Sequence, residues 1–121
     1  MDFLARLIHP RAEAAPPSAQ AASVEPLEAR RRQTAGVLLV DVREPDEWRA
    51  GHAPGATHIP LGELHAQLTA IPRDRDVLLI CRSGNRSQQA QRLLRAAGYP
   101  LAINVAGGMV AWGRAGLPIV P

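Results

Sequence analysis

The sequence predicts an α/β domain in which helices cover both faces of a mostly parallel central sheet. The candidate strands are continuous apolar runs, such as VLLVDV and VLLIC, and such runs are typical of strands buried on both faces. These runs alternate along the chain with segments of helical periodicity, which favours parallel strands joined by helices. With 121 residues the chain has room for a single domain, and a hydrophobic content of 46% is typical of a globular protein.

The expected elements follow one another in order from residue 23. Strands are expected at residues 37–42, 56–59, 77–81 and 101–105. Helices are expected at residues 26–33, 45–50, 61–71 and 87–97, followed by a short helix after Gly107. The segment 87–97 spaces its apolar residues for one buried face and stops at Gly98, a residue favoured at helix C-caps. Ligands of such sheets bind beyond the carboxyl ends of the strands, where Cys81 lies.

Residues 1–22 differ in composition from the rest of the chain. They are rich in Ala, Pro, Ser and Gln without a sustained period, which predicts a flexible tail before a domain at residues 23–119. The stretch Ala19-Gln20-Ala21 resembles a signal-peptidase site, but charged residues and prolines interrupt the apolar region that such a signal requires. No segment reaches the length needed to span a bilayer, so we expect a soluble, cytoplasmic protein.

The charged residues favour a small anionic partner. All 14 basic residues are arginines, and the formal net charge is +3. Only Arg30, Arg31 and Arg32 are contiguous, and scattered arginines are a weak electrostatic footprint for nucleic acid. The single cysteine cannot form an intramolecular disulfide, and no Cys/His spacing matches a structural zinc site. The sequence therefore predicts neither a metal nor another cofactor.

A short polar loop separates a predicted buried strand from a predicted helix. Its residues are Cys81, Arg82, Ser83, Gly84, Asn85, Arg86 and Ser87. Backbone N–H groups of such a loop, with those of the helix start, can converge on one centre and hold negative charge there. A cysteine at the start of this cradle is predicted to be a thiolate nucleophile, because the same donors lower its pKa. The alternative, an inert core cysteine, explains neither the glycine nor the arginines that follow.

The two arginines of this loop predict recognition of an anion. The guanidinium of Arg82 or Arg86 offers several donors in a planar fork that suits an oxyanion. The alternative for both residues is a solvated charge without a ligand. We expect the whole segment from Arg82 to Ser87 to form the binding loop for an anionic substrate.

Four motifs resemble those of the rhodanese family and occur in the family's order. Besides the loop LICRSGNRS, they are DVRE with EW at residues 41–48, GHAPGA with HIP at residues 51–60, and VAGGMVAW at residues 105–112. The resemblance covers about residues 23–119 and implies a rhodanese-like fold. The residues expected to support the site structurally are Asp41, Arg43, His52, Gly107 and Gly108. Among them, His52 is interpreted as an organiser of its loop rather than as a general base.

The resemblance implies a sulfurtransferase that needs no cofactor. Cys81 would take the outer sulfur of an anionic donor such as thiosulfate, become a persulfide, and pass the sulfur to cyanide, a small thiol or a protein thiol. One alternative is a cysteine-dependent phosphatase or arsenate reductase, whose Cys-x5-Arg signature is longer than the Cys-x4-Arg found here. The other is a non-catalytic rhodanese-like binding or regulatory module, although such modules commonly lack the cysteine.

Overall fold

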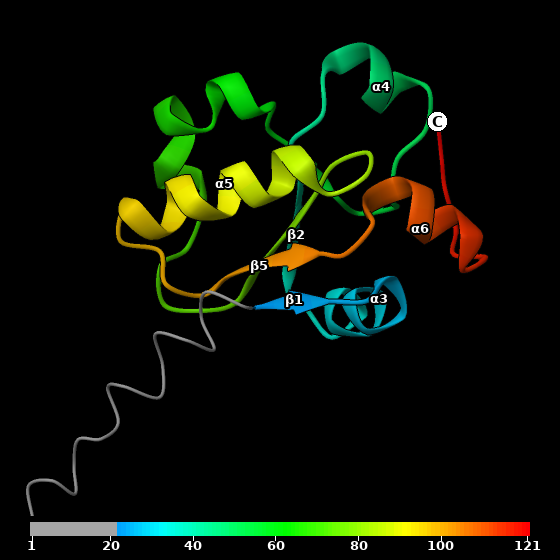
Figure 1. Cartoon of the computed structure of the whole chain (residues 1–121), viewed down its shortest axis with the longest axis horizontal. Coiled ribbons are helices and arrows are strands. Elements are labelled where there is room, and N and C mark those ends of the chain that lie inside the picture. Colours follow the sequence, from blue (N-terminus) through cyan, green and yellow to red (C-terminus); the bar gives the residue numbers. More distant parts are fainter. Residues whose placement is uncertain (1–21) are drawn as a thin grey trace, which may run out of the picture.

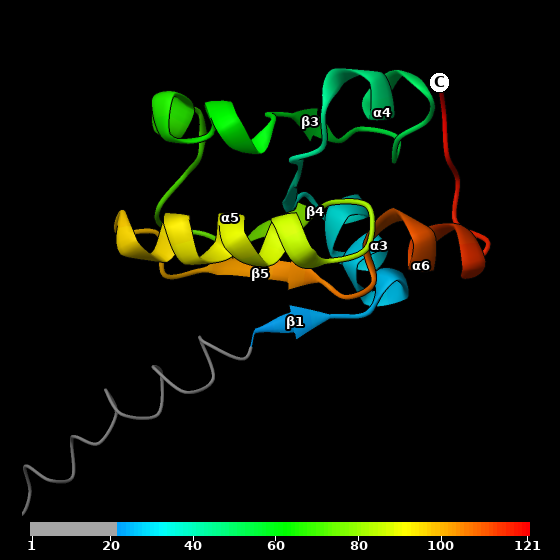
Figure 2. The ribbon, with the colours of Figure 1, turned by 45° about the horizontal axis from the view of Figure 1, so that its top comes forward.

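The computed structural model describes residues 22–121, which form a five-stranded sheet with helices on both faces. The strands are β1 (Ser23–Val24), β2 (Leu38–Asp41), β3 (Thr57–His58), β4 (Val77–Ile80) and β5 (Ala102–Val105). Their order across the sheet is β1-β5-β4-β2-β3, and every neighbouring pair is parallel. The predicted fold class is therefore confirmed. β1 forms the sheet edge beyond β5 (Figure 2) and was not predicted, because two residues are too few for a periodic pattern.

Apolar side chains of the strands alternate between two cores. The helices are α3 (Pro26–Thr34), α4 (Pro45–Arg49), α5 (Asn85–Ala96) and α6 (Gly108–Arg114), with the 3-10 helices η1 (Leu61–Glu63) and η2 (His65–Ala70). On one face, Val40 and Leu79 pack with Leu94 of α5. On the other face, Leu39 and Leu78 belong to the core that includes residues of α3 and α6. The alternation explains why β2 and β4 are apolar at successive positions.

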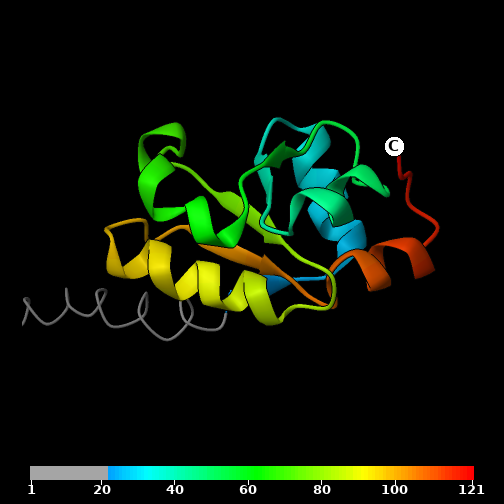
Figure 3. The same ribbon diagram turned by 90° about the horizontal axis from the view of Figure 1, so that it is seen from above.

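The helix predicted at residues 61–71 is wrong in type. The structure has two 3-10 helices there, and Gln67, with φ −116° and ψ 25°, departs from helical geometry. The segment lies beside α5 (Figure 3), with Leu64 fully buried. Apolar residues three apart fall on one face of either helix type, so the spacing of Leu61 and Leu64 could not distinguish them.

The carboxyl ends of β2, β4 and β5 meet at one edge of the sheet, beside α4 and the start of α6 (Figure 1). The loop that follows β4 lies at this edge. α5 begins at Asn85, two residues before the predicted start, because Gly84 adopts φ +116° and serves as the N-cap. None of the helices within residues 22–121 is long and apolar enough to cross a membrane. Apart from Ala22, the predicted tail lies outside the described residues.

Candidate active site

The candidate nucleophile, Cys81, lies directly after β4 at the carboxyl edge of the sheet. Its side chain is buried, with 1% of the residue exposed. The Gly84 N–H donates to Sγ over 3.0 Å, and Oγ of Ser87 lies 3.3 Å from Sγ. Gly84 reaches this position because its positive φ turns the chain sharply into α5. The loop and the first turn of the helix thus converge on the sulfur.

Burial and hydrogen bonding act on Cys81 in opposite directions. Burial is the largest single influence and raises the pKa of the thiol, because the charged form loses its hydration. The Ser87 hydroxyl and the backbone N–H groups of Ser87, Gly84 and Ser83 lower it. Together these donors outweigh burial, so the pKa of Cys81 lies below its usual value. The site favours the thiolate, which is the nucleophilic form of cysteine.

The start of α6, with Gly107 as the N-cap and Gly108 as the first residue, fixes the outer side of the loop. The N–H groups of Met109 and Val110 donate to the carbonyls of Cys81 and Arg82 over 2.8 and 3.0 Å. The N–H of a trans peptide points away from its carbonyl, so pinning the Arg82 carbonyl outward turns the Ser83 N–H toward the sulfur. This close approach requires Gly108, since a Cβ there would lie 2.6 Å from the Arg82 carbonyl carbon.

Ser87 connects the sulfur to a residue that sequence reasoning missed. Its Oγ lies 2.5 Å from Oδ1 of Asn104 and 3.1 Å from the Gly84 carbonyl oxygen. Asn104 belongs to β5 and is 4% exposed. A polar residue within an otherwise apolar buried strand needs a partner, and this requirement was the available signal. The structure places that partner beside Cys81.

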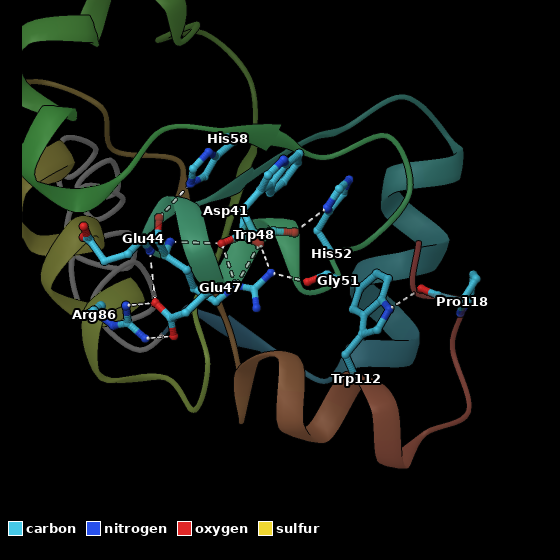
Figure 4. Close-up of polar contacts among 11 residues, drawn as sticks. Asp41, Glu44, Glu47, Trp48, Gly51, His52, His58, Arg86, Trp112 and Pro118 are labelled. Atoms are coloured by element: carbon cyan, nitrogen blue, oxygen red, sulfur yellow. Dashed lines mark hydrogen bonds and ion pairs between the residues drawn. The ribbon is translucent and has the colours of Figure 1, made fainter. Parts of the chain in front are cut away.

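Arg86 does not present a free guanidinium to the loop. Its Nη1 and Nη2 donate to the two carboxylate oxygens of Glu47 over 2.6 and 2.9 Å, as Figure 4 shows. This pairing lowers the pKa of Glu47 to about 2 and ties the loop to α4. The predicted role of Arg86 as an anion receptor therefore meets a competing partner on the same protein.

The other loop residues divide between exposed and buried positions. Arg82, Ser83 and Asn85 are exposed, whereas Gly84 and Ser87 are buried. Within residues 22–121, no protein hydrogen bond or ion pair engages the Arg82 guanidinium. Among the described residues, Arg82 is thus the exposed loop arginine whose guanidinium no other residue engages.

Asp41 and Arg43 form a buried pair at the carboxyl end of β2. Arg43 donates through Nε and Nη2 to the Asp41 carboxylate over 2.8 to 3.0 Å, and Nη2 also donates to the Gly51 carbonyl oxygen over 2.7 Å. Both side chains are almost fully buried. A buried charge needs such compensation, and the pair joins the end of β2 to the segment after α4. Neither residue hydrogen-bonds to Cys81.

His52 organises a stack of rings rather than contacting the sulfur. Its ring stacks on Trp48 with centroids 3.5 Å apart, and Trp48 stacks on His58 with centroids 4.7 Å apart. Nδ1 of His52 lies 2.8 Å from the Trp48 carbonyl oxygen, and Nε2 of His58 lies 2.7 Å from that of Arg43. Because those oxygens only accept, each nitrogen carries the hydrogen of its bond. The stack holds α4, and hence Glu47, in place.

The chain resembles known proteins over most of its length. The family model described as Rhodanese-like domain matches residues 23–115. The chain belongs to the rhodanese-like family. A sulfurtransferase from Allochromatium vinosum is 46% identical over 96 residues, which span 79% of this chain and 90% of that protein. The family resemblance predicted from four motifs is thereby confirmed.

Several solved structures share this fold. A rhodanese-related protein from Thermoplasma volcanium is 31% identical with a TM-score of 0.75, and the match covers 82% of this chain and 97% of that one. A Rhodopseudomonas palustris protein of unknown function, described as a possible tyrosine phosphatase, is 26% identical with a TM-score of 0.73. That match covers 89% of this chain and 92% of the other.

Proposed function

We propose that this protein is a sulfurtransferase that carries a sulfur atom as a persulfide on Cys81. The observation that carries the proposal is the convergence of polar groups on Sγ, with the Gly84 N–H donating over 3.0 Å and the Ser87 hydroxyl 3.3 Å away. These donors favour an anionic sulfur in a buried place. The sulfurtransferase from A. vinosum, at 46% identity, supports the same class of activity.

The reaction proceeds in two steps on one sulfur. The Cys81 thiolate attacks the outer sulfur of thiosulfate, a new S–S bond forms, and the S–S bond of thiosulfate breaks with release of sulfite. The persulfide anion then occupies the cradle. An acceptor, cyanide or a thiolate, attacks the outer sulfur, and the electron pair of the breaking bond returns to Cys81. After both steps Cys81 is a thiolate again, and the oxidation state of the enzyme is unchanged.

Arg82 supplies the attraction for the anionic donor. It is exposed at the loop, while Arg86 is held by Glu47 over 2.6 Å. An exposed guanidinium raises the local concentration of a small anion and offers it a planar pair of donors. The proposed donor is thus bound by Arg82 and by the exposed loop, whereas Arg86 fixes the loop to α4 through Glu47.

Two features favour sulfur transfer over phosphatase chemistry. The segment from Cys81 to Arg86 has four intervening residues, one fewer than the Cys-x5-Arg signature of the cysteine-dependent phosphatases. In that signature an arginine closes on a tetrahedral oxyanion, but both terminal nitrogens of Arg86 are engaged by Glu47. The presence of Cys81 likewise favours an enzyme over a non-catalytic binding module.

An intact-mass measurement tests the proposal. The purified protein is reduced, freed of reductant and treated with thiosulfate, and we expect a gain of one sulfur atom that a thiol reductant removes. Cys81→Ser is the matched control and should gain nothing. Hydrolysis of an aryl phosphate without sulfur uptake would instead support a phosphatase, and failure of both reactions would support a binding module.

A further inference from the structure

Three polar side chains form a chain of contacts from the candidate sulfur to the edge of the sheet. Oγ of Ser87 lies 3.3 Å from Cys81 Sγ and 2.5 Å from Asn104 Oδ1. Nδ2 of Asn104 in turn lies 3.4 Å from Oγ of Ser23, an exposed residue of β1. Ser87 and Asn104 are buried, so these contacts replace the hydration that both side chains lost on folding.

The Ser87 hydroxyl has more acceptors within reach than it has hydrogens. It carries one hydrogen, and the acceptors are Cys81 Sγ, the Gly84 carbonyl oxygen at 3.1 Å and Asn104 Oδ1 at 2.5 Å. With the shortest contact made to Asn104, the hydrogen lies there and Ser87 only accepts from Cys81. This arrangement suits a protonated thiol. A thiolate, by contrast, needs the hydrogen of Ser87 for itself.

Rotating the side-chain amide of Asn104 by half a revolution gives a second hydrogen-bond arrangement, which suits a thiolate. The oxygen and nitrogen of a side-chain amide exchange positions in this rotation without any other movement. Nδ2 then donates to Ser87 Oγ, which releases the hydrogen of Ser87 to the sulfur, and Oδ1 accepts from the hydroxyl of Ser23. Because a hydroxyl both donates and accepts, every polar atom of the chain keeps a partner in either state.

We propose that Asn104 is a positioning residue that sets the direction of the Ser87 hydroxyl and thereby stabilises the charged forms of Cys81. Its effect on the persulfide rests on the proposed function, whereas its effect on the thiolate does not. Although burial raises the pKa of Cys81, hydrogen bonds led by the Ser87 side chain bring it below its usual value. The neighbours of Asn104 in β5, which are Ala102, Ile103 and Val105, have apolar side chains, so Asn104 is the residue of that strand that can orient the hydroxyl, in competition with the Gly84 carbonyl oxygen.

The test compares thiolate titrations of persulfide-free variants, followed by ultraviolet absorbance and by the rate of iodoacetamide reaction. Asn104→Leu removes both polar atoms at nearly constant size. Without the amide, the Ser87 hydroxyl is left to the Gly84 carbonyl oxygen at 3.1 Å, which is nearer than Sγ. We therefore expect the titration midpoint of this variant to move to higher pH and its alkylation rate at neutral pH to fall about three- to tenfold, the effect of losing roughly one hydrogen bond to an anion. An unchanged titration in a folded variant would overturn the proposal.

A double-variant cycle separates action through Ser87 from a general structural effect. Ser87→Ala alone should also move the midpoint upward. In the Ser87→Ala background, Asn104→Leu should add nothing, because the group through which Asn104 acts is gone. Additive shifts of the two substitutions would contradict the proposed relay.

Gln91→Leu is the matched control, since it removes another buried amide, this one from α5, the helix that carries Ser87. Nε2 of Gln91 donates to the carbonyl oxygens of Ala22 and Ala102 over 2.7 and 3.0 Å. We expect this variant to lose thermal stability while its Cys81 titration stays that of the wild type. A shift as large as that of Asn104→Leu would show that loosening the sheet edge is sufficient, and would overturn the proposal.

A substitute variant and a measurement of sulfur uptake ensure that each outcome supports or contradicts one of the two proposals. If Asn104→Leu does not fold, Asn104→Thr, which suits a strand but shortens the reach to Ser87, should move the midpoint upward, and an unmoved midpoint would count against the relay. Normal sulfur uptake from thiosulfate without coupling between Asn104 and Ser87 would overturn only the relay. Coupling without sulfur uptake would overturn only the proposed function.

Discussion

Gly108→Ala should disrupt the cradle from its outer side. Gly108 has φ +57°, and a Cβ at this position would lie 2.6 Å from both the carbonyl carbon and the oxygen of Arg82. These are backbone atoms, so no side chain can move aside to relieve the contact. Either α6 or the loop must shift, and the hydrogen bonds from Met109 and Val110 to the loop carbonyls, 2.8 and 3.0 Å long, would be lost.

The structure gives both the size of the effect and a control. An alanine in the left-handed region costs roughly 1–2 kcal/mol, and two lost hydrogen bonds cost about 1 kcal/mol each. Gly116, at φ +76° with nothing within 4 Å of its would-be Cβ, shares only the first cost. Gly108→Ala should therefore destabilise the protein by about 2 kcal/mol more than Gly116→Ala. For a domain of this size the difference corresponds to roughly 8 °C in melting temperature.

Thermal unfolding measures the loss of stability, and the Cys81 titration measures the effect on the donors of the loop. Gly108→Ala should melt well below Gly116→Ala, and only Gly108→Ala should move the thiolate midpoint to higher pH, because its loop N–H groups lose their orientation. Equal melting temperatures for the two variants would refute the steric reasoning. A large loss of stability with an unchanged titration would refute the idea that α6 orients the donors of the loop.

Four more outcomes follow from the site. Cys81→Ser should take up no sulfur from thiosulfate yet unfold near the wild-type temperature, and sulfur uptake by this variant would contradict the proposed role. Glu47→Gln should lose about 1 kcal/mol of stability at neutral pH. Because the Arg86 pair lowers the pKa of Glu47 from 4.5 to about 2, the wild type should lose this advantage as the pH falls through that range, and a deficit that persists in acid would exclude the charge as its cause. Arg82→Gln should raise KM for thiosulfate more than it slows discharge of a preformed persulfide to cyanide, and equal effects would indicate a structural arginine. A chain shortened to begin at Ala22 should keep its activity, since the Ala22 carbonyl that accepts from Gln91 is retained, and a large loss would assign a role to residues 1–21.

The sequence was sufficient for the framework of the fold because the framework depends on local patterns. The apolar runs of β2 and β4 indicated strands that are buried on both faces, and Gly84 indicated the turn before α5. The 3-10 geometry of η1 and η2 was not predicted, since an apolar spacing of three residues fits either helix type.

The contacts that tune the site were not predictable, because they join distant segments. Arg86 and Glu47 are 39 positions apart, and nothing in the loop alone showed that a carboxylate of α4 would take both guanidinium nitrogens. The role of Asn104 was equally hard to predict, because the sequence shows only one polar residue in a predicted strand. Its contact with Ser87 arises only when β5 is placed beside β4, which is a property of the strand order.

The burial of Cys81 and the rigidity of its donors together explain why such a loop suits transfer of a sulfur. Burial alone would favour the neutral thiol, so the donors must be held in place before charge develops, and α5 and α6 hold them. An S–S bond is about 2 Å long, so the outer sulfur of a persulfide would lie one bond beyond a residue that is 1% exposed. The loop residues Ser83 and Asn85 are exposed. An acceptor would therefore meet the outer sulfur before it could reach Sγ, which favours release of the transferred atom over attack on the cysteine itself.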